Sequence, residues 1–162
     1  MKYITLSKGF KVKVDEENFE KLNQFKWHVM TGGKNKIPYA HRWNNKRRGI
    51  FMHKILIKNG SFYSVDHING DSLDNRKKNL RLCTNRQNQC NQKKQKRSTS
   101  SKYKGVVKKG NSQIKPYRSY ITINKKQIHL GRFKTEEEAA YAYNKAAIKY
   151  FKEFARLNEV IK

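Results

Sequence analysis

VDHINGDSLDNRKKNLRLCTNRQNQCN, residues 65–91, holds an Asp-His pair, a polar turn, a short apolar strand pattern and an amide-rich helix start. Between residues 21 and 135 the chain has only three acids, Asp66, Asp71 and Asp74, and all of them lie in this stretch. Because the formal net charge is +26, acids here are not needed to keep the protein soluble. Their placement indicates a functional role.

The stretch has the pattern of a strand, a loop, a second strand and a helix. Residues 64–68 are β-like, Asn69-Gly70 is a strong turn signal, and leucines alternate in residues 80–82. Residues 84–87, TNRQ, fit a capping box, so we expect a helix to begin there. Its first turn would fold Asn88 back over the strand that carries the Asp-His pair.

Three polar side chains are therefore predicted to converge. Mg²⁺ commonly takes one or two protein oxygen ligands, adding water and substrate phosphate, and Asp66 and the Asn88 amide can supply such ligands. His67, with an ordinary pKa of about 6.5, can accept a proton from an attacking water at pH 7. A bound ion would polarise the phosphate. Adjacent strand residues face opposite sides, so Asp66 and His67 can share a site only on twisted or bulged backbone.

The pattern Asp66-His67, Asn79-Leu80-Arg81 and Gln87-Asn88 resembles the H-N-H nucleases of the ββα-metal fold, which include phage and intron-encoded homing endonucleases. The resemblance implies that His67 is the general base and that Asn79 braces the loop between the strands. It also implies that Asp66 and Asn88 bind a divalent cation such as Mg²⁺ or Mn²⁺. Some members have two cysteine pairs for a structural zinc; this chain has only Cys83 and Cys90, so that zinc is not expected.

The composition favours a nucleic-acid partner. Lys and Arg number 38 against 12 acids, and the mean hydropathy of −1.02 leaves little apolar material for one large core. No stretch approaches the roughly eighteen apolar residues of a membrane span, and the N-terminus lacks the apolar region of a signal peptide. We expect no membrane partner and a cytoplasmic protein, in a bacterial or phage-infected cell, with both cysteines reduced.

Residues 1–60 are predicted to form a small mixed unit, and together with the motif at 65–91 they make a nuclease domain over residues 1–92. Asp15 can cap a short helix, and residues 50–57 form a further apolar segment. Strands are expected over residues 3–6, 10–14, 27–30 and 37–43. Because residues 21–65 contain ten basic residues and no acid, this region should present a cationic wall. His53 could approach the active site, although a structural role is the more common one for such a histidine.

Residues 93–101 are predicted to be a basic linker. The run QKKQKRSTSSK, residues 92–102, has five basic residues, no acid and no large apolar side chain. The cations expected to follow a phosphate backbone or a minor groove are Lys93, Lys94, Lys96 and Arg97.

Residues 102–162 are predicted to be a separate domain, a three-stranded sheet covered by one helix. Strand-like runs occupy residues 103–107, 117–123 and 127–133, and Asn124-Lys125 marks a tight turn. A capping box at 135–138 starts a helix whose apolar stripe comprises Ala139, Ala140, Tyr143, Ala147, Tyr150, Phe151 and Phe154. On the middle strand, residues 119, 121 and 123 would face this helix, leaving Arg118, Tyr120 and Thr122 on the open face.

Residues 103–106, 128–133 and 135–143 resemble the plant ethylene-response-factor DNA-binding domain, which also occurs in phage-type H-N-H proteins. In that family the open sheet face enters the major groove. By position, this role falls on Lys104, Tyr120, Thr122, Gln127 and His129. Phosphate or guanine contacts are expected from Lys104, Lys108, Lys109, Arg118 and Arg132, and Gln127 can read adenine. Plant members mostly have Arg, Glu and Trp at the matching positions, so their base preference does not transfer.

The sequence thus predicts an α+β protein, with a ββα-metal nuclease region beside a small N-terminal sheet and a three-stranded antiparallel sheet packed on one helix. The expected activity is metal-dependent, site-specific cleavage of double-stranded DNA, by a monomer that nicks one strand. Two alternatives stay open. One is a noncatalytic DNA-binding protein or regulator with a residual nuclease fold. The other, an RNA-binding protein, fits the charge but explains neither Asp66 nor Asn88.

Overall fold

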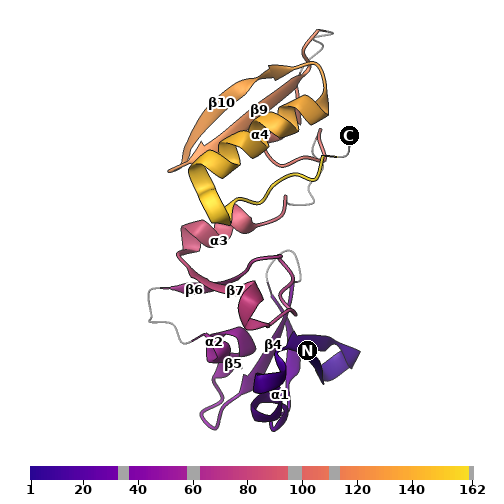
Figure 1. Ribbon diagram of the computed structural model, residues 1–162, viewed down its shortest axis with the longest axis vertical. Coiled ribbons are helices and arrows are strands. Elements are labelled where there is room, and N and C mark those ends of the chain that lie inside the picture. The colour runs from indigo at the N-terminus through magenta and orange to yellow at the C-terminus, as the bar shows by residue number, and fades with distance from the viewer. Residues whose placement is uncertain (33–36, 58–62, 95–99, 110–113, 161–162) are drawn as a thin grey trace. The chain divides into compact units, whose positions relative to one another are not determined.

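The computed structural model describes residues 1–32, 37–57, 63–94, 100–109 and 114–160 (Figure 1). It is an α+β structure built from small sheets and mostly short helices. The chain divides into two compact units, Met1–Gln89 and Cys90–Lys162, which we call unit 1 and unit 2. Within the described residues, no helix combines the length and the apolar composition that crossing a bilayer requires.

In its described residues, unit 1 contains three small antiparallel sheets. They are β1 (Lys2–Thr5) with β2 (Lys11–Val14); β3 (His28–Gly32) with β4 (Ile37–Trp43) and β5 (Gly49–Phe51); and β6 (Ser64–His67) with β7 (Leu80–Cys83). The helices are α1 (Glu16–Asn23), α2 (Met52–Leu56) and α3 (Asn85–Asn91), which ends in unit 2. One core joins the first two sheets to α1 and α2, and its most buried side chains include Val12, Val14, Leu22, Trp27 and Met52.

Most local predictions for unit 1 are confirmed, and one needs correction. The capping box of α3 is formed, since the Thr84 N–H donates to Gln87 Oε1 at 2.8 Å and the Gln87 N–H donates to Thr84 Oγ1 at 3.2 Å. The apolar segment 50–57 divides between β5 and the helix α2. Asp15 occupies the N-cap position of α1, but its side chain does not cap the helix, because its Oδ2 accepts a hydrogen bond from the Lys77 N–H at 2.7 Å.

Unit 2 has one antiparallel sheet, in the order β10-β9-β8, with one face covered by helix α4 (Figure 1). Its elements are β8 (Val106–Lys108), β9 (Tyr117–Ile123), β10 (Lys126–Phe133) and α4 (Glu136–Phe151). Ser119 and Ile121 are buried under α4 and Thr122 is exposed, as the alternation predicted. The predicted capping box of α4 is present, and the predicted turn at Asn124-Lys125 has positive φ at both residues.

Two predicted details of unit 2 are wrong. The first strand begins at Val106 instead of residue 103, because Gly105 has a φ of +75° and interrupts the extended backbone. No side chain fits there, since a Cβ on Gly105 would lie 2.1 Å from Cδ2 of Tyr143 and 2.6 Å from the carbonyl oxygen of Tyr120. Tyr150 does not belong to the buried stripe of α4, because it is 44% exposed.

Candidate active site

His67 ends β6 with its side chain buried. Its Nε2 lies 3.2 Å from Oδ1 of Asn75, which is only 1% exposed. An amide oxygen can only accept a hydrogen bond, so this contact requires the ring proton on Nε2 and leaves the basic lone pair on Nδ1. Burial lowers the pKa of His67, while the Asn75 hydrogen bond and then the charges of Asp66, Asp71 and Asp74 act in the opposite direction. The ring is held neutral, as a general base requires.

Aromatic side chains from β4 and from the β5–α2 segment surround the His67 ring. His53 meets it edge-on at a centroid distance of 5.2 Å, and Tyr39 lies 6.2 Å away. Phe51 stacks on His53 at 5.5 Å. Burial, together with the neighbouring His67 and the charge of Lys54, lowers the pKa of His53 to about 3, so His53 is also neutral. His53 therefore does approach the candidate active site, because its ring packs against that of His67.

Asn79 closes the loop that joins β6 to β7. Its Oδ1 accepts from the Asn69 N–H at 3.0 Å, and its Nδ2 donates to the Asp74 carbonyl at 2.8 Å. The backbone adds a third contact, from the Ile68 N–H to the Asn79 carbonyl at 2.8 Å. Because Asn79 is buried, these bonds fix both ends of the loop.

The same loop is anchored by a buried carboxylate and by the N-terminal hairpin. Asp74 is fully buried and accepts from Arg76 Nε at 2.7 Å and Nη2 at 2.6 Å, and this pairing lowers the pKa of Asp74. On either side of Asp74, the Lys13 N–H of β2 donates to the Leu73 carbonyl, and the Asn75 N–H donates to the Lys13 carbonyl, both at 2.8 Å. These bonds place Asn75 beside His67.

Asp66 lies on the other face of the β6–β7 ribbon. Asp66 is opposite Arg81 and His67 is opposite Leu80, in a register without a bulge along these two strands. Arg81 donates from Nε and Nη2 to Asp66 Oδ2, at 2.9 Å and 2.7 Å. The bulge that would bring Asp66 and His67 to one face is therefore not part of this ribbon. Tyr39 is close to both side chains, since its ring contacts His67 and its pKa is raised by burial and by the Asp66 charge.

Asn88 lies in the first turn of α3, and its backbone N–H is close to Cys83, at the end of β7. Asn88 is half-buried in α3, and its N–H donates to the Thr84 carbonyl at 3.0 Å. Burial raises the pKa of Cys83 to about 11; the Asp66 charge adds to the rise, and the Asn88 N–H opposes it. The Asp66 charge and the backbone N–H of Asn88 thus both act on this thiol.

The predicted ligands Asp66 and Asn88 suit a largely hydrated ion. One carboxylate and one amide are oxygen ligands of the kind that Mg²⁺ combines with water and phosphate. Across the described parts of the chain, no three His, Cys, Asp or Glu side chains gather closely enough to hold a metal by themselves. The residues therefore fit an ion that takes few protein ligands and completes its coordination with substrate.

Six of the predicted DNA contacts form three pairs on the open face of the unit 2 sheet. The pairs are Arg118 with Arg132, Tyr120 with His129, and Thr122 with Gln127. A register shift between His129 and Gly131 inserts one residue into β10 and so keeps Arg132 on the same face as His129. Lys108 lies on β8, opposite Tyr117, and Lys109 follows it.

Two other predicted DNA contacts, Lys94 and Lys104, are engaged inside unit 2. Their ammonium groups donate to backbone carbonyls: Lys104 to Cys90 at 2.7 Å and Gln92 at 2.8 Å, and Lys94 to Ser101 at 2.6 Å and Tyr103 at 2.7 Å. Burial lowers the pKa of both lysines. Both ammonium groups therefore stabilise the backbone of residues 90–103 and do not lie on the open sheet face. Lys93 is exposed, and Lys96 and Arg97 lie outside the described residues.

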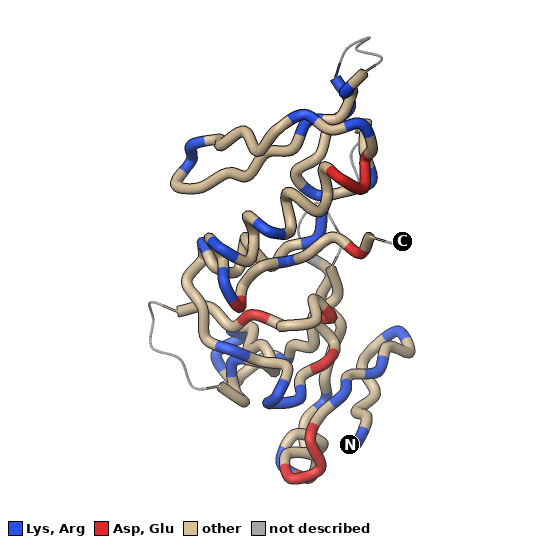
Figure 2. The backbone as a smooth tube through the Cα atoms, turned by 45° about the horizontal axis from the view of Figure 1, so that its top comes forward, with Lys and Arg blue, Asp and Glu red and all other residues tan. Residues whose placement is uncertain are grey.

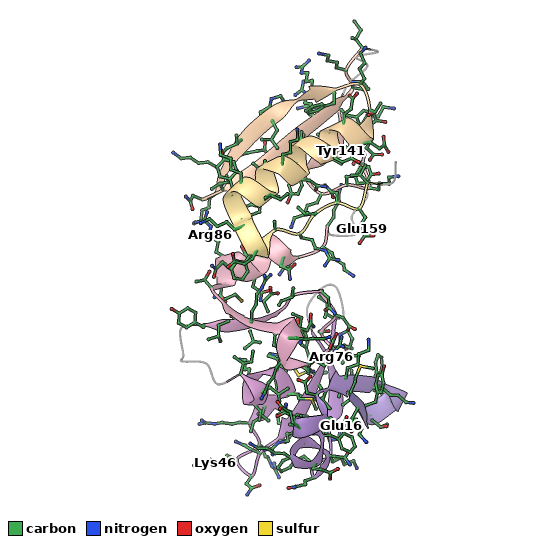
Figure 3. The ribbon with its side chains drawn as sticks, viewed as in Figure 1. Glu16, Lys46, Arg76, Arg86, Tyr141 and Glu159 are labelled. Atoms are coloured by element: carbon green, nitrogen blue, oxygen red, sulfur yellow. The ribbon has the colours of Figure 1, made fainter. Side chains whose placement is uncertain are left out.

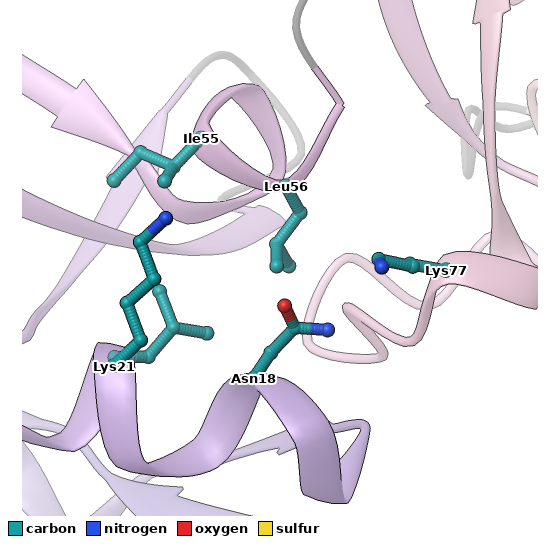
Figure 4. A pocket seen from close by; sticks show the side chains of 6 residues that line it. Asn18, Lys21, Ile55, Leu56 and Lys77 are labelled. Carbon is teal, nitrogen blue, oxygen red and sulfur yellow. The ribbon is translucent and has the colours of Figure 1, made fainter.

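A cavity of about 380 Å³ in unit 1 is separate from these residues (Figure 4). Its lining comprises Asn18, Lys21, Leu22, Ile55, Leu56 and Lys77. The Lys77 ammonium is paired with Glu17 at 2.6 Å, and the lining includes no group suited to activating water. We assign no catalytic role to this cavity.

Asn75 and Tyr39 are the site residues that sequence reasoning missed. Asn75 follows an acid in a polar loop, where an amide is common and carries no special signal. Tyr39 lies in a strand 28 residues before His67, and nothing in its neighbourhood marks it as more than a strand aromatic.

Comparison with known proteins gives the class of this site. The HNH endonuclease family profile matches residues 57–90, which include β6, the braced loop and β7. Over 163 aligned residues the chain is 32% identical to a protein of Acanthamoeba polyphaga mimivirus named an uncharacterized HNH endonuclease, covering 98% of this chain and 81% of the relative. No solved structure matches the chain.

The chain therefore belongs to the HNH endonuclease family and is a DNA-cleaving hydrolase. HNH nucleases generally use a divalent metal ion. Between the readings that the sequence left open, these matches favour the nuclease.

Proposed function

We propose that the protein is a site-specific endonuclease that hydrolyses one strand of duplex DNA, as a monomer, with a divalent ion such as Mg²⁺ or Mn²⁺. The observation that carries this proposal is the buried, neutral His67 whose Nε2 is held by Asn75. A neutral imidazole whose Nε2 is the donor carries its basic lone pair on Nδ1, which is the chemical form that accepts a proton.

In the proposed reaction, Nδ1 of His67 takes a proton from a water molecule as this water attacks the phosphorus atom. The bond from phosphorus to the 3′ oxygen breaks, and a solvent water molecule gives this oxygen a proton, which leaves a 5′-phosphate and a 3′-hydroxyl, with the proton of the attacking water on His67. Asn75 holds the ring orientation and its tautomer, and the packing of His53 and Tyr39 excludes solvent from the other sides of the ring. Asn79 keeps the loop that carries Asn75 closed.

Asp66 and Asn88 would hold the divalent ion. Because Asp66 and His67 alternate along a regular ribbon, the phosphate would have to lie past the end of β6, where both side chains can reach it. When bound, the ion supplies polarisation of the phosphate and stabilisation of charge on the leaving oxygen. Arg81 orients the Asp66 carboxylate through its two hydrogen bonds to Oδ2, and it keeps the charge of this buried acid balanced. The ββα-metal arrangement is thus proposed for the segment β6, β7 and α3.

Unit 2 is proposed to position the nuclease by binding the major groove, in the manner of the ethylene-response-factor domain. The support for this role is the open sheet face, on which Arg118 and Arg132 lie next to residues that can form hydrogen bonds with bases. The other side of the sheet is covered by α4, so the open face is the side available to a partner.

The test is a plasmid-nicking assay with the full chain and Mg²⁺. His67→Ala should abolish the conversion of supercoiled plasmid to open circles, while gel-shift affinity for duplex DNA stays within about twofold, because no DNA contact is assigned to this ring. His28→Ala, in β3, is the matched histidine control and should cut normally. A His67→Ala protein that still nicks DNA would refute the assigned base.

A further inference from the structure

The hairpin between β4 and β5 ends in a well-defined tip that contains three successive cations. Oδ1 of Asn44 accepts from the N–H of Lys46 at 3.0 Å and from the N–H of Arg48 at 2.8 Å. The Asn44 N–H donates to the Arg48 carbonyl at 3.0 Å, and the Arg47 N–H donates to the Asn44 carbonyl at 2.9 Å. Arg47 takes a positive φ of 54° to close this turn. Four hydrogen bonds thus fix the backbone that presents Lys46, Arg47 and Arg48.

These three cations have no acidic counterpart nearby in sequence. Residues 21–65 contain no Asp or Glu, and elsewhere acids occur in a few short segments (Figure 2). None of the ion pairs found in the described part of the protein involves residues 46–48. All three residues are exposed, and Lys46 lies at the outer edge of unit 1 (Figure 3). Adjacent like charges held on a fixed turn repel one another and attract a polyanion.

An exposed aromatic ring stands next to the cations. Trp43 is 56% exposed, and its indole meets the ring of His41 edge-on at 5.5 Å. It also lies close to Gly49 across the hairpin, where a Cβ would be 3.7 Å from the indole ring. An indole supported on one side and open on the other can pack against the sugars or exposed bases of a nucleic acid.

A continuous series of packed rings connects this tip to His67. The centroid distances are 5.5 Å for Trp43 to His41, 6.3 Å for His41 to Phe51, 5.5 Å for Phe51 to His53, and 5.2 Å for His53 to His67. The pairing of β4 with β5 places His41 opposite Phe51 and Trp43 opposite Gly49, so paired strands support the series. A ligand held at the tip is therefore positioned relative to the catalytic histidine.

From these contacts we infer that the tip of the β4–β5 hairpin, residues 43–49, binds the sugar-phosphate backbone of the same DNA duplex whose phosphate His67 attacks. Lys46, Arg47 and Arg48 contact phosphates, and Trp43 packs against a sugar. This site rests on the proposed function, since it deepens the DNA binding of the nuclease unit. It gives unit 1 a DNA-binding site of its own, in addition to the proposed site on the sheet of unit 2.

The test measures duplex binding in the full chain carrying His67→Ala, without divalent ion, so that cleavage chemistry has no influence on the result. The hairpin variant changes Lys46, Arg47 and Arg48 to Gln. The matched control changes three exposed lysines elsewhere in unit 1, Lys8, Lys11 and Lys21, to Gln, so both proteins lose the same charge. Fluorescence of the buried Trp27 checks that both remain folded.

The measured quantity is the slope of log affinity against log salt concentration. Each phosphate contact contributes about 0.9 to this slope, so the hairpin variant should flatten it by about 2 to 3, and the control variant by less than about 1. Trp43→Ala should weaken binding about tenfold and leave the slope unchanged, because a packing contact releases no counterion.

Equal slopes for the hairpin and control variants would overturn the inference, since the weaker salt dependence would then reflect the lower net charge alone. The inference would also be overturned if the His67→Ala protein with an unchanged hairpin bound a structured RNA competitor more tightly than duplex DNA. Failure of the proposed function is distinguished by the nicking assay: a protein without nuclease chemistry would show the hairpin effect on binding and cut no plasmid.

Discussion

Replacing His53 with phenylalanine should make unit 1 less sensitive to acid. His53 takes up a proton near pH 6.5 in the unfolded chain, whereas in the folded chain its pKa is about 3 and it stays neutral. Protonation thus favours the unfolded state, and stability present above pH 6.5 is lost as the pH falls towards 3. Between pH 7 and pH 5 this loss is about 2 kcal/mol, from about 1.5 pH units at about 1.4 kcal/mol each. Phenylalanine keeps the ring beside Phe51 and His67 but cannot titrate.

The assay is urea unfolding followed by tryptophan fluorescence at pH 7 and pH 5. Both tryptophans, Trp27 and Trp43, belong to unit 1, so the signal reports on this unit. The wild type should lose about 2 kcal/mol more than His53→Phe between the two pH values, because the other titrating groups are the same in both proteins. His129→Phe, in unit 2, is the control and should behave like the wild type. Equal pH dependence of wild type and His53→Phe would refute the reasoning.

Four further predictions follow from the site and the fold. Because burial lowers the pKa of His67, the acidic limb of the nicking rate should lie below pH 6.5, and a limb at or above 6.5 in single-turnover assays would contradict the assigned base. Asn79→Ala leaves one buried and one partly buried backbone group of the loop without this partner and should cost about 2 to 3 kcal/mol by the same fluorescence assay, whereas Asn18→Ala, which removes only an exposed bond to Glu17, should cost less than about 0.5 kcal/mol. Gly105→Ala should destabilise unit 2 by about 3 kcal/mol, seen as faster amide hydrogen exchange in β9 with β1 and β2 unchanged; unaltered exchange would show that the Tyr143 ring can move aside. Lys104→Met should leave the salt slope of duplex binding unchanged, whereas Arg118→Gln should flatten it by about 0.9; a flatter slope for Lys104→Met would restore this lysine as a phosphate contact.

Features that depend on neighbouring residues could be predicted from the sequence. The capping boxes at 84–87 and 135–138 and the turn at Asn124-Lys125 each involve residues a few positions apart, and all three are present. The two faces of β9 follow from the strict alternation of a strand, so they were predictable as well. Local backbone geometry and side-chain periodicity are sufficient for such features.

Features that depend on distant contacts could not be predicted. Asn75 becomes part of the site because β2, some sixty residues earlier, holds its backbone. Lys104 was expected on the open sheet face, but the carbonyls of residues 90 and 92 are close enough in the folded unit to take its ammonium. His53 was recognised as a candidate, yet only the packing of α2 against β6 decides that its ring meets His67. A pattern in one segment carries no information about which other segment will pack on it.

The bonds between β2 and the loop of Asn75 have a consequence for protein engineering. The segment that matches the family profile, residues 57–90, does not contain Lys13, Tyr39 or His53, which support the loop and the His67 ring from upstream. Grafted alone onto a foreign DNA-binding scaffold, the segment would expose the imidazole to water, return its pKa towards 6.5 and free its ring to rotate. A functional chimaera has to include the chain from the first β-hairpin onward.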